Sequence, residues 1–121
     1  MNNFVVWFEI PVSNLDRAMK FYSKVMSVEL QSMGLGTNKQ AAFPFVPGVA
    51  SGSLKENKES EPSAAGTMIY LNGGEDLSAP LARVEAAGGK IIKKKTSIGE
   101  HGFMAIFKDT EGNHIALHSR K

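Results

Sequence analysis

The order of predicted secondary structure occurs twice along the chain, and this repeat constrains the fold more than any other feature. Each half of the 121-residue sequence reads as a strand, a helix and three more strands, with Asn57–Gly66 between the halves. That segment is polar, contains Pro, Ser and Gly, and lacks an apolar period, which is typical of a linker. One such half cannot bury both faces of its own sheet. We therefore expect two modules, about 1–56 and 67–121, within a single domain.

The first half begins with a predicted strand over Phe4–Val12, which is dense in β-branched and aromatic residues. Ser13 or Asn14 is expected to cap a helix over Leu15–Met26, whose apolar residues recur at helical spacing. Short apolar runs broken by glycine and proline then predict three strands. Their ranges are Glu29–Met33, Gln40–Phe45 and Gly48–Lys55.

The second half repeats this order, beginning with a predicted strand over Thr67–Leu71. Asp76 or Ser78 is expected to cap the second helix, which Gly88 and Gly89 would end. Three further strands are predicted over Lys90–Lys94, Phe103–Phe107 and His114–His118.

Composition excludes several classes of protein. The chain has no cysteine, which rules out disulfides and thiolate chemistry and favours the cytoplasm. No apolar run approaches the ~20 residues of a membrane helix, and no basic and apolar leader precedes the first strand. The basic cluster of Lys90 and Lys93–Lys95 lacks interleaved aromatic residues, so we expect no nucleic-acid or membrane partner.

Several motifs, taken in order, make the chain similar to the vicinal oxygen chelate superfamily. These are Phe8-Glu9-Ile10-Pro11-Val12, Leu15 to Tyr22, Ala86-Ala87-Gly88-Gly89 and Asp109-Thr110-Glu111-Gly112-Asn113. The superfamily includes glyoxalase I, bleomycin-resistance proteins and extradiol dioxygenases. The resemblance implies an α+β fold of two βαβββ modules whose sheets join around a central cavity.

The resemblance also implies where a divalent metal would bind, because the superfamily's enzymes hold it with His and Glu side chains from the first and last strands of each module. At those positions this chain has Trp7, Ser53, Met68 and Ala116. Indole, hydroxyl, thioether and methyl groups do not suit a divalent cation. We therefore expect no metal cofactor, and the same residues, with Tyr70, are expected to line an apolar pocket for a small molecule.

Two other side chains are candidates for chemistry on the same strands. Glu9 lies two residues after Trp7, and His118 two residues after Ala116, so each is expected on the cavity face of its strand. The two side chains form either an acid/base pair, a displaced metal site or a buried structural pair. His101, flanked by glycine in a loop, is expected to close over them, whereas His114 is expected outside on the opposite face.

Three functions remain open from the sequence. The first is a metal-free protein that binds a small organic molecule, as bleomycin-resistance proteins do. The second is an enzyme, related to the lyases, isomerases or dioxygenases of the superfamily, that uses Glu9 and His118. The third is a structural or regulatory dimer with a vestigial cavity. Small proteins of this fold often dimerise, so we expect a homodimer in which modules pair within a chain or are exchanged between chains.

Overall fold

The computed structural model describes residues 3–34, 39–58 and 61–121. Residues 59–60 of the predicted linker lie outside the described residues. The first module contains β1 (Trp7–Pro11), α1 (Leu15–Met26), β2 (Gln31–Met33), β3 (Lys39–Ala42) and β4 (Ser51–Glu56). The second contains β5 (Tyr70–Asn72), α2 (Ser78–Val84), β6 (Lys90–Ser97), a 3₁₀ turn (Gly99–His101), β7 (Phe103–Lys108) and β8 (His114–Ser119).

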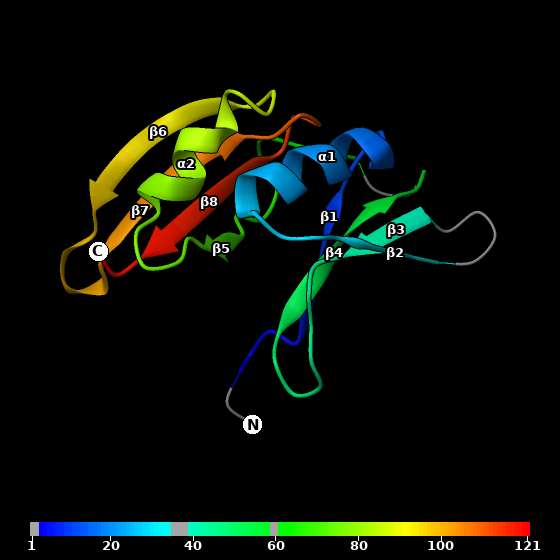
Figure 1. The fold of residues 1–121 in the computed structure, drawn as a ribbon, viewed down its shortest axis with the longest axis horizontal. Coiled ribbons are helices and arrows are strands. Elements are labelled where there is room, and N and C mark those ends of the chain that lie inside the picture. Colours follow the sequence, from blue (N-terminus) through cyan, green and yellow to red (C-terminus); the bar gives the residue numbers. More distant parts are fainter. Residues whose placement is uncertain (1–2, 35–38, 59–60) are drawn as a thin grey trace.

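The two modules form two four-stranded sheets with the same strand order (Figure 1). The first sheet has the order β1-β4-β3-β2 and the second β5-β8-β7-β6. In each sheet the first strand runs parallel to the last strand of its module, and the other pairs are antiparallel. The predicted α+β fold of two βαβββ modules is therefore confirmed. It leaves β1 and β5 as edge strands.

Helix α1 spans Leu15–Met26, as its apolar period predicted. Asn14 is the N-cap, and its side-chain oxygen accepts a hydrogen bond from the backbone N–H of Arg17 at 3.0 Å. The helix ends at Met26, and the C-cap residue Ser27 adopts the left-handed conformation with φ 54°. Of the two predicted caps, Asn14 and not Ser13 performs this role.

Helix α2 begins differently from the prediction. Leu77 is its N-cap and provides no side-chain cap, so the prediction of Asp76 or Ser78 as the cap was wrong. The Asp76 carboxylate instead accepts a hydrogen bond from the Ser78 N–H at 2.9 Å, one residue ahead of the cap position. The helix stops at Val84, and Gly88 follows with φ 104°, where a side chain would be strained.

The five strands predicted between Phe4 and Leu71 are each longer than the observed strands β1 to β5, because the apolar runs extend beyond the residues that pair. The first was expected from Phe4, but β1 begins at Trp7, where pairing with β4 begins opposite Ser51. The fifth was expected over Thr67–Leu71, but β5 pairs with β8 only over Tyr70–Asn72. Apolar composition alone therefore overestimated the paired length of both edge strands.

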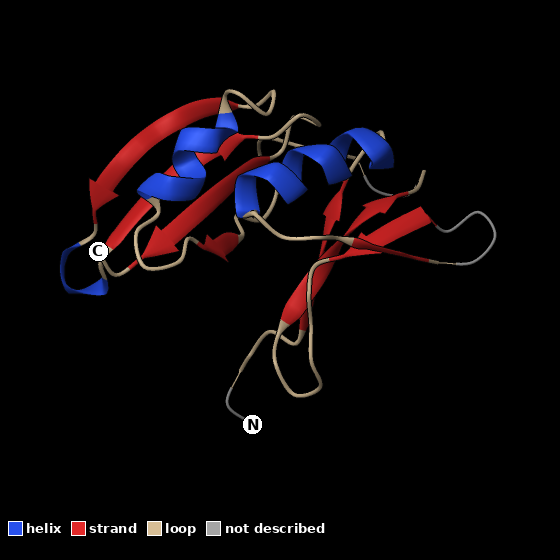
Figure 2. Cartoon of the chain, viewed as in Figure 1, coloured by secondary structure: helices blue, strands red, loops and turns tan. Residues whose placement is uncertain are grey.

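Both helices lie on the same side of the two sheets (Figure 2). Helix α1 packs on β3 and β4 of the first sheet and reaches β7 of the second sheet through an aromatic side chain. The Phe21 ring of α1 lies 5.7 Å from the Phe107 ring of β7, between ring centroids. The neighbouring Tyr22 ring lies 5.8 Å from Phe43, which follows β3. The buried aromatic side chains of α1 thus join both modules into one hydrophobic core. No helix in the described part of the chain is long and apolar enough to cross a membrane.

Candidate functional site

The candidate residues lie on the helix-free face, by which we mean the sheet surfaces turned away from α1 and α2. On β1, Ile10 points into the core, so period-two alternation turns Trp7 and Glu9 to the helix-free face. On β8, Ile115 and Leu117 point into the core. The alternate positions of this strand, His114, Ala116 and His118, therefore belong to the helix-free face.

The predicted ligand contacts differ in accessibility. Tyr70 is 55% exposed and Met68 36% exposed, and Trp7 is half-buried with its ring edge-on to Phe45 at 5.5 Å. Ser53 and Ala116 are fully buried. The helix-free face therefore offers two aromatic side chains from the edge strands β1 and β5, together with one methionine.

Ser53 has a structural partner within its own sheet. Its hydroxyl donates a hydrogen bond to the side-chain oxygen of Gln40 on β3 at 2.8 Å. This bond satisfies a buried polar group, because an unpaired hydroxyl at a fully buried position would be costly. Ser53 is therefore a buried polar residue beneath the helix-free face and is not accessible on its surface.

Glu9 lies beside a cation of its own module. Its carboxylate accepts a hydrogen bond from the Lys55 ammonium at 3.4 Å, and both residues lie on the parallel strands β1 and β4. The Glu9 side chain is 47% exposed, so this pair is worth little to stability. Of the three alternatives for Glu9 and His118, the buried structural pair is wrong, because Glu9 lies exposed on an edge strand and pairs with Lys55.

His118 is held by the loop that carries His101. The His118 Nε2 atom lies 2.7 Å from the backbone carbonyl oxygen of His101 and donates a hydrogen bond to it. The His101 imidazole itself is 76% exposed and lies 3.9 Å from Glu100. The structure thus brings His118 and His101 together through a backbone atom, whereas Glu9 and His118 have different partners. A shared catalytic role for Glu9 and His118 stays a prediction.

A small pocket adjoins Glu9 where the two sheets meet. It measures about 150 Å³, and its lining includes Glu9, Glu61, Thr67 and His114. The expectation that His114 lies on the opposite face from His118 was wrong. Both side chains are even-numbered positions of one strand, and strand alternation places them on the same side.

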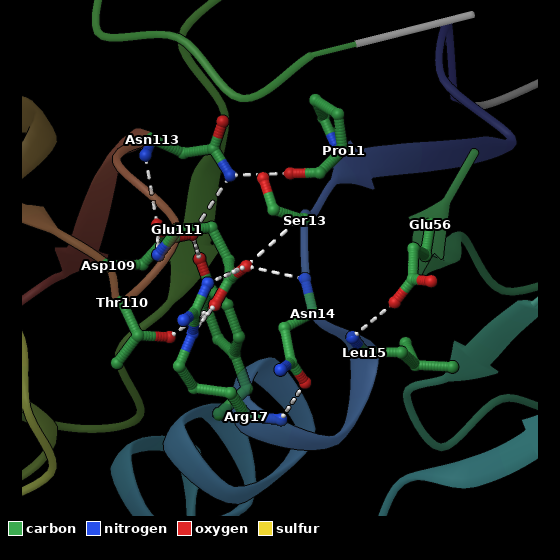
Figure 3. A network of polar contacts seen from close by, with 11 residues as sticks. Pro11, Ser13, Asn14, Leu15, Arg17, Glu56, Asp109, Thr110, Glu111 and Asn113 are labelled. Carbon is green, nitrogen blue, oxygen red and sulfur yellow. Dashed lines mark hydrogen bonds and ion pairs between the residues drawn. The ribbon is translucent and has the colours of Figure 1, made fainter. Parts of the chain in front are cut away.

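The turn between β7 and β8, residues 109–113, contains side chains whose role the sequence did not reveal (Figure 3). Asp109 and Asn113 are 3% and 4% exposed, and the Glu111 side chain is fully shielded from solvent. All three contact residues of the first module. The sequence indicated only a turn, because its spacing carries no information about partners some ninety positions away.

Comparison with known proteins places these features in a family. Residues 4–117 match the model of the Glyoxalase/Bleomycin resistance protein/Dioxygenase superfamily. The chain belongs to this superfamily. It is also 32% identical over 116 residues to a glyoxylase-like domain-containing protein of Didymella fabae, covering 93% of this chain and 90% of that protein.

Solved structures share the fold of this chain at low sequence identity. A mutant of glyoxalase I from Zea mays superposes with a TM-score of 0.75 at 20% identity, covering 95% of this chain and 46% of the maize enzyme. TnmS3, an antibiotic-binding protein from a Streptomyces species, superposes with a TM-score of 0.65 at 23% identity, covering 100% and 99% of the two chains. These similarities show the shared architecture.

The metal site of the superfamily's enzymes does not fit the residues of this chain. Its four implied positions hold Trp7, Ser53, Met68 and Ala116, which offer no carboxylate or imidazole. Two of the four are fully buried. Among residues 3–34, 39–58 and 61–121, no group of three or more His, Cys, Asp or Glu side chains is arranged to hold a metal ion.

Proposed function

We propose that this superfamily member binds a small organic molecule with an aromatic part on its helix-free face, without a resident divalent metal. The observation that carries this proposal is the pair of accessible aromatic residues, Trp7 and Tyr70, on the edge strands of the two sheets. Met68 lies two residues before Tyr70 and adds a polarisable, adaptable contact. Aromatic side chains supply large contact areas at low entropic cost, so they suit a flat ligand.

Two further observations support binding over metal-assisted chemistry. The four positions implied for the metal lack suitable donors, so the ion that supplies the Lewis-acid step in the superfamily's metalloenzymes would have no ligands at those positions. TnmS3, which has the same fold over its whole length, is an antibiotic-binding protein. A drug-binding or metabolite-binding role is therefore the function that these residues fit best.

The proposed binding is tested by calorimetric titration with anilinonaphthalenesulfonate, an aromatic dye that reports apolar sites. Trp7 is the only tryptophan, so its fluorescence gives an independent signal from the site itself. We expect Trp7→Ala and Tyr70→Ala each to weaken dye binding at least about 10-fold, which corresponds to about 1.4 kcal/mol. The matched control is Ile92→Ala, because Ile92 is 45% exposed on β6. Equal effects from the control would contradict the proposed site.

The metal-free part of the proposal has its own test. Titration with Ni²⁺, Zn²⁺ or Mn²⁺ is expected to show no stoichiometric binding, measured by calorimetry and by thermal shift. Tight one-to-one binding that disappears in a Glu9→Gln, His118→Asn variant would favour the displaced metal site instead. Mass spectrometry of molecules that copurify with the protein would identify the natural ligand directly.

We further propose that the protein is a homodimer. The N-terminal apolar surface, which we define as Phe4–Val6 with Phe45, Val46 and Val49, is exposed by 52% or more at every residue. Such clusters on a folded chain mark interaction sites. Phe45 contacts Trp7, so this surface is continuous with the proposed ligand face. Light scattering after size exclusion should show a dimer that Val46→Lys dissociates and Ile92→Lys leaves intact.

A further inference from the structure

The turn between β7 and β8 belongs to the second module, yet its side chains reach three different parts of the first (Figure 3). The Asp109 carboxylate accepts a hydrogen bond from the Tyr22 hydroxyl of α1 at 2.6 Å. The Asn113 amide donates one to the backbone oxygen of Pro11, at the end of β1, at 2.7 Å. Glu111 binds the segment that joins β1 to α1.

Glu111 provides the densest set of these contacts. One carboxylate oxygen accepts hydrogen bonds from the backbone N–H groups of Ser13 and Asn14 at 2.9 and 2.8 Å. The guanidinium of Arg17 donates to both carboxylate oxygens, from Nη2 at 2.8 Å and from Nε at 2.7 Å. A two-point contact of this kind fixes direction as well as distance. The Glu111 side chain therefore determines how the start of α1 sits against the second module.

Hydrogen bonds within the turn hold its backbone, and thereby the Glu111 side chain, in place. The second oxygen of the Asp109 carboxylate accepts hydrogen bonds from the backbone N–H groups of Glu111 and Asn113 at 2.8 and 2.9 Å. The Asn113 side-chain oxygen also accepts a bond from the backbone N–H of Ser63, in the chain that connects the modules, at 3.0 Å. Residues 109–113 are thus held by hydrogen bonds within the turn, and they contact β1, α1 and the chain that connects the modules.

We propose that this turn is a clamp that fixes the orientation of the two sheets, with Glu111 as a positioning residue for the ligand face. The clamp ties the last residue of β1 to the start of β8. Strand β1 carries Trp7 at its other end, and β8 pairs with β5, which carries Tyr70. Trp7 and Tyr70 come from different sheets, so their separation depends on that orientation. The effect on ligand binding rests on the proposed function, whereas the effect on orientation does not.

The chain has no cysteine, so two engineered cysteines can report the orientation directly. Spin labels at Gln31→Cys on β2 and Lys94→Cys on β6, both exposed positions, measure the distance between the sheets by double electron–electron resonance. We expect one narrow distance distribution in the otherwise unchanged protein and a broadened or shifted one in Glu111→Gln. An unchanged distribution in Glu111→Gln would overturn the clamp.

Glu56→Gln is the matched control. The Glu56 carboxylate also accepts a hydrogen bond from the start of α1, from the Leu15 N–H at 2.8 Å, but it comes from β4 of the same module. Its removal weakens the same helix end without cutting a link between modules. We expect the distance distribution of Glu56→Gln to match that of the unchanged protein. Equal broadening in both variants would also overturn the proposal.

Arg17→Gln keeps the clamp testable if Glu111→Gln fails to fold. It removes the guanidinium and leaves the two backbone donors in place, so we expect a smaller broadening.

Dye titration tests the positioning role of Glu111, and we expect the affinity for anilinonaphthalenesulfonate to fall several-fold in the Glu111 variant and not in Glu56→Gln. A broadened distribution with unchanged affinity would overturn the positioning role. If the unchanged protein binds no dye, the proposed function fails, while the distance measurement still decides the clamp.

Discussion

Arg17 and Glu111 form a two-point ion pair although 94 positions separate them in the sequence. The Arg17 side chain is 51% exposed, whereas the Glu111 side chain is completely shielded. The pair joins the first helix of one module to the last turn of the other. The two modules are therefore held together by an ion pair as well as by their shared hydrophobic core.

Replacing Glu111 by Gln should destabilise the protein by about 1–3 kcal/mol, since a shielded carboxylate with several donors is lost. The amide keeps one acceptor oxygen but turns an N–H₂ group toward the donors of Arg17. Urea denaturation measures the change, with Glu56→Gln as the control. Glu56 retains 29% side-chain exposure, so its substitution should cost less. A larger loss in Glu56→Gln would contradict the importance assigned to the link between modules.

The contribution of Glu111 should disappear in acid. Burial alone would raise its pKa, but hydrogen bonds from Arg17, Asn14, Thr110 and Ser13 outweigh burial and lower the pKa from 4.5 to about 2. A carboxyl with a lower pKa in the folded state stabilises the fold above its unfolded pKa and loses this effect as the pH falls toward the folded value.

The stability difference between the unchanged protein and Glu111→Gln should thus be constant above pH 5 and shrink between about pH 4.5 and 2. Urea denaturation at a series of pH values measures it. The Asp76 pKa is also lowered to about 2, chiefly by a hydrogen bond from Lys95, but this effect is present in both proteins and cancels in the difference. A difference that persists unchanged to pH 2.5 would refute the assignment.

Tyr22→Phe should cost about 1–2 kcal/mol, because it removes the hydroxyl that donates to Asp109 and leaves a buried carboxylate with fewer donors. Burial and the adjacent Asp109 both raise the pKa of Tyr22 well above its ordinary value. The matched control is Tyr70→Phe, which removes the hydroxyl of a 55% exposed residue and should change stability by less than about 0.5 kcal/mol. Thermal unfolding compares the two, and equal losses would argue against the buried bond.

Gly89→Ala should be strongly destabilising, because an added Cβ would lie 2.6 Å from the Lys108 carbonyl oxygen and 2.7 Å from the Phe21 ring. Neither the strand backbone nor a fully buried ring can move away cheaply, so we expect a loss of at least about 2 kcal/mol. Gly66→Ala is the control, since a Cβ added there would approach only the Cβ of Ser63, at 4.0 Å. Comparable denaturation midpoints for both variants would show that the contact at Gly89 can relax.

Local patterns predicted the elements of this fold well. Helix α1 has the predicted bounds, and strands β7 and β8 begin at the predicted residues, because their apolar periods are unbroken. Strands β1 to β5 are shorter than predicted and β6 is longer, since strand length depends on which residues pair. Of the predicted ligand contacts, Trp7, Met68 and Tyr70 are accessible, whereas Ser53 and Ala116 are buried, and their role in binding stays a prediction.

The sequence by itself determined the repeat, the two modules and the lack of metal-binding side chains at the implied positions, because period, composition and donor chemistry are local properties. Only the tertiary structure decided that His118 binds the His101 carbonyl, that Glu9 pairs with Lys55, and that Glu111 holds the start of α1. These contacts join residues 17 to 97 positions apart. The first two contacts depend on the loop and the strand pairing within one module, the third depends on how the two modules pack, and no local pattern encodes any of these arrangements.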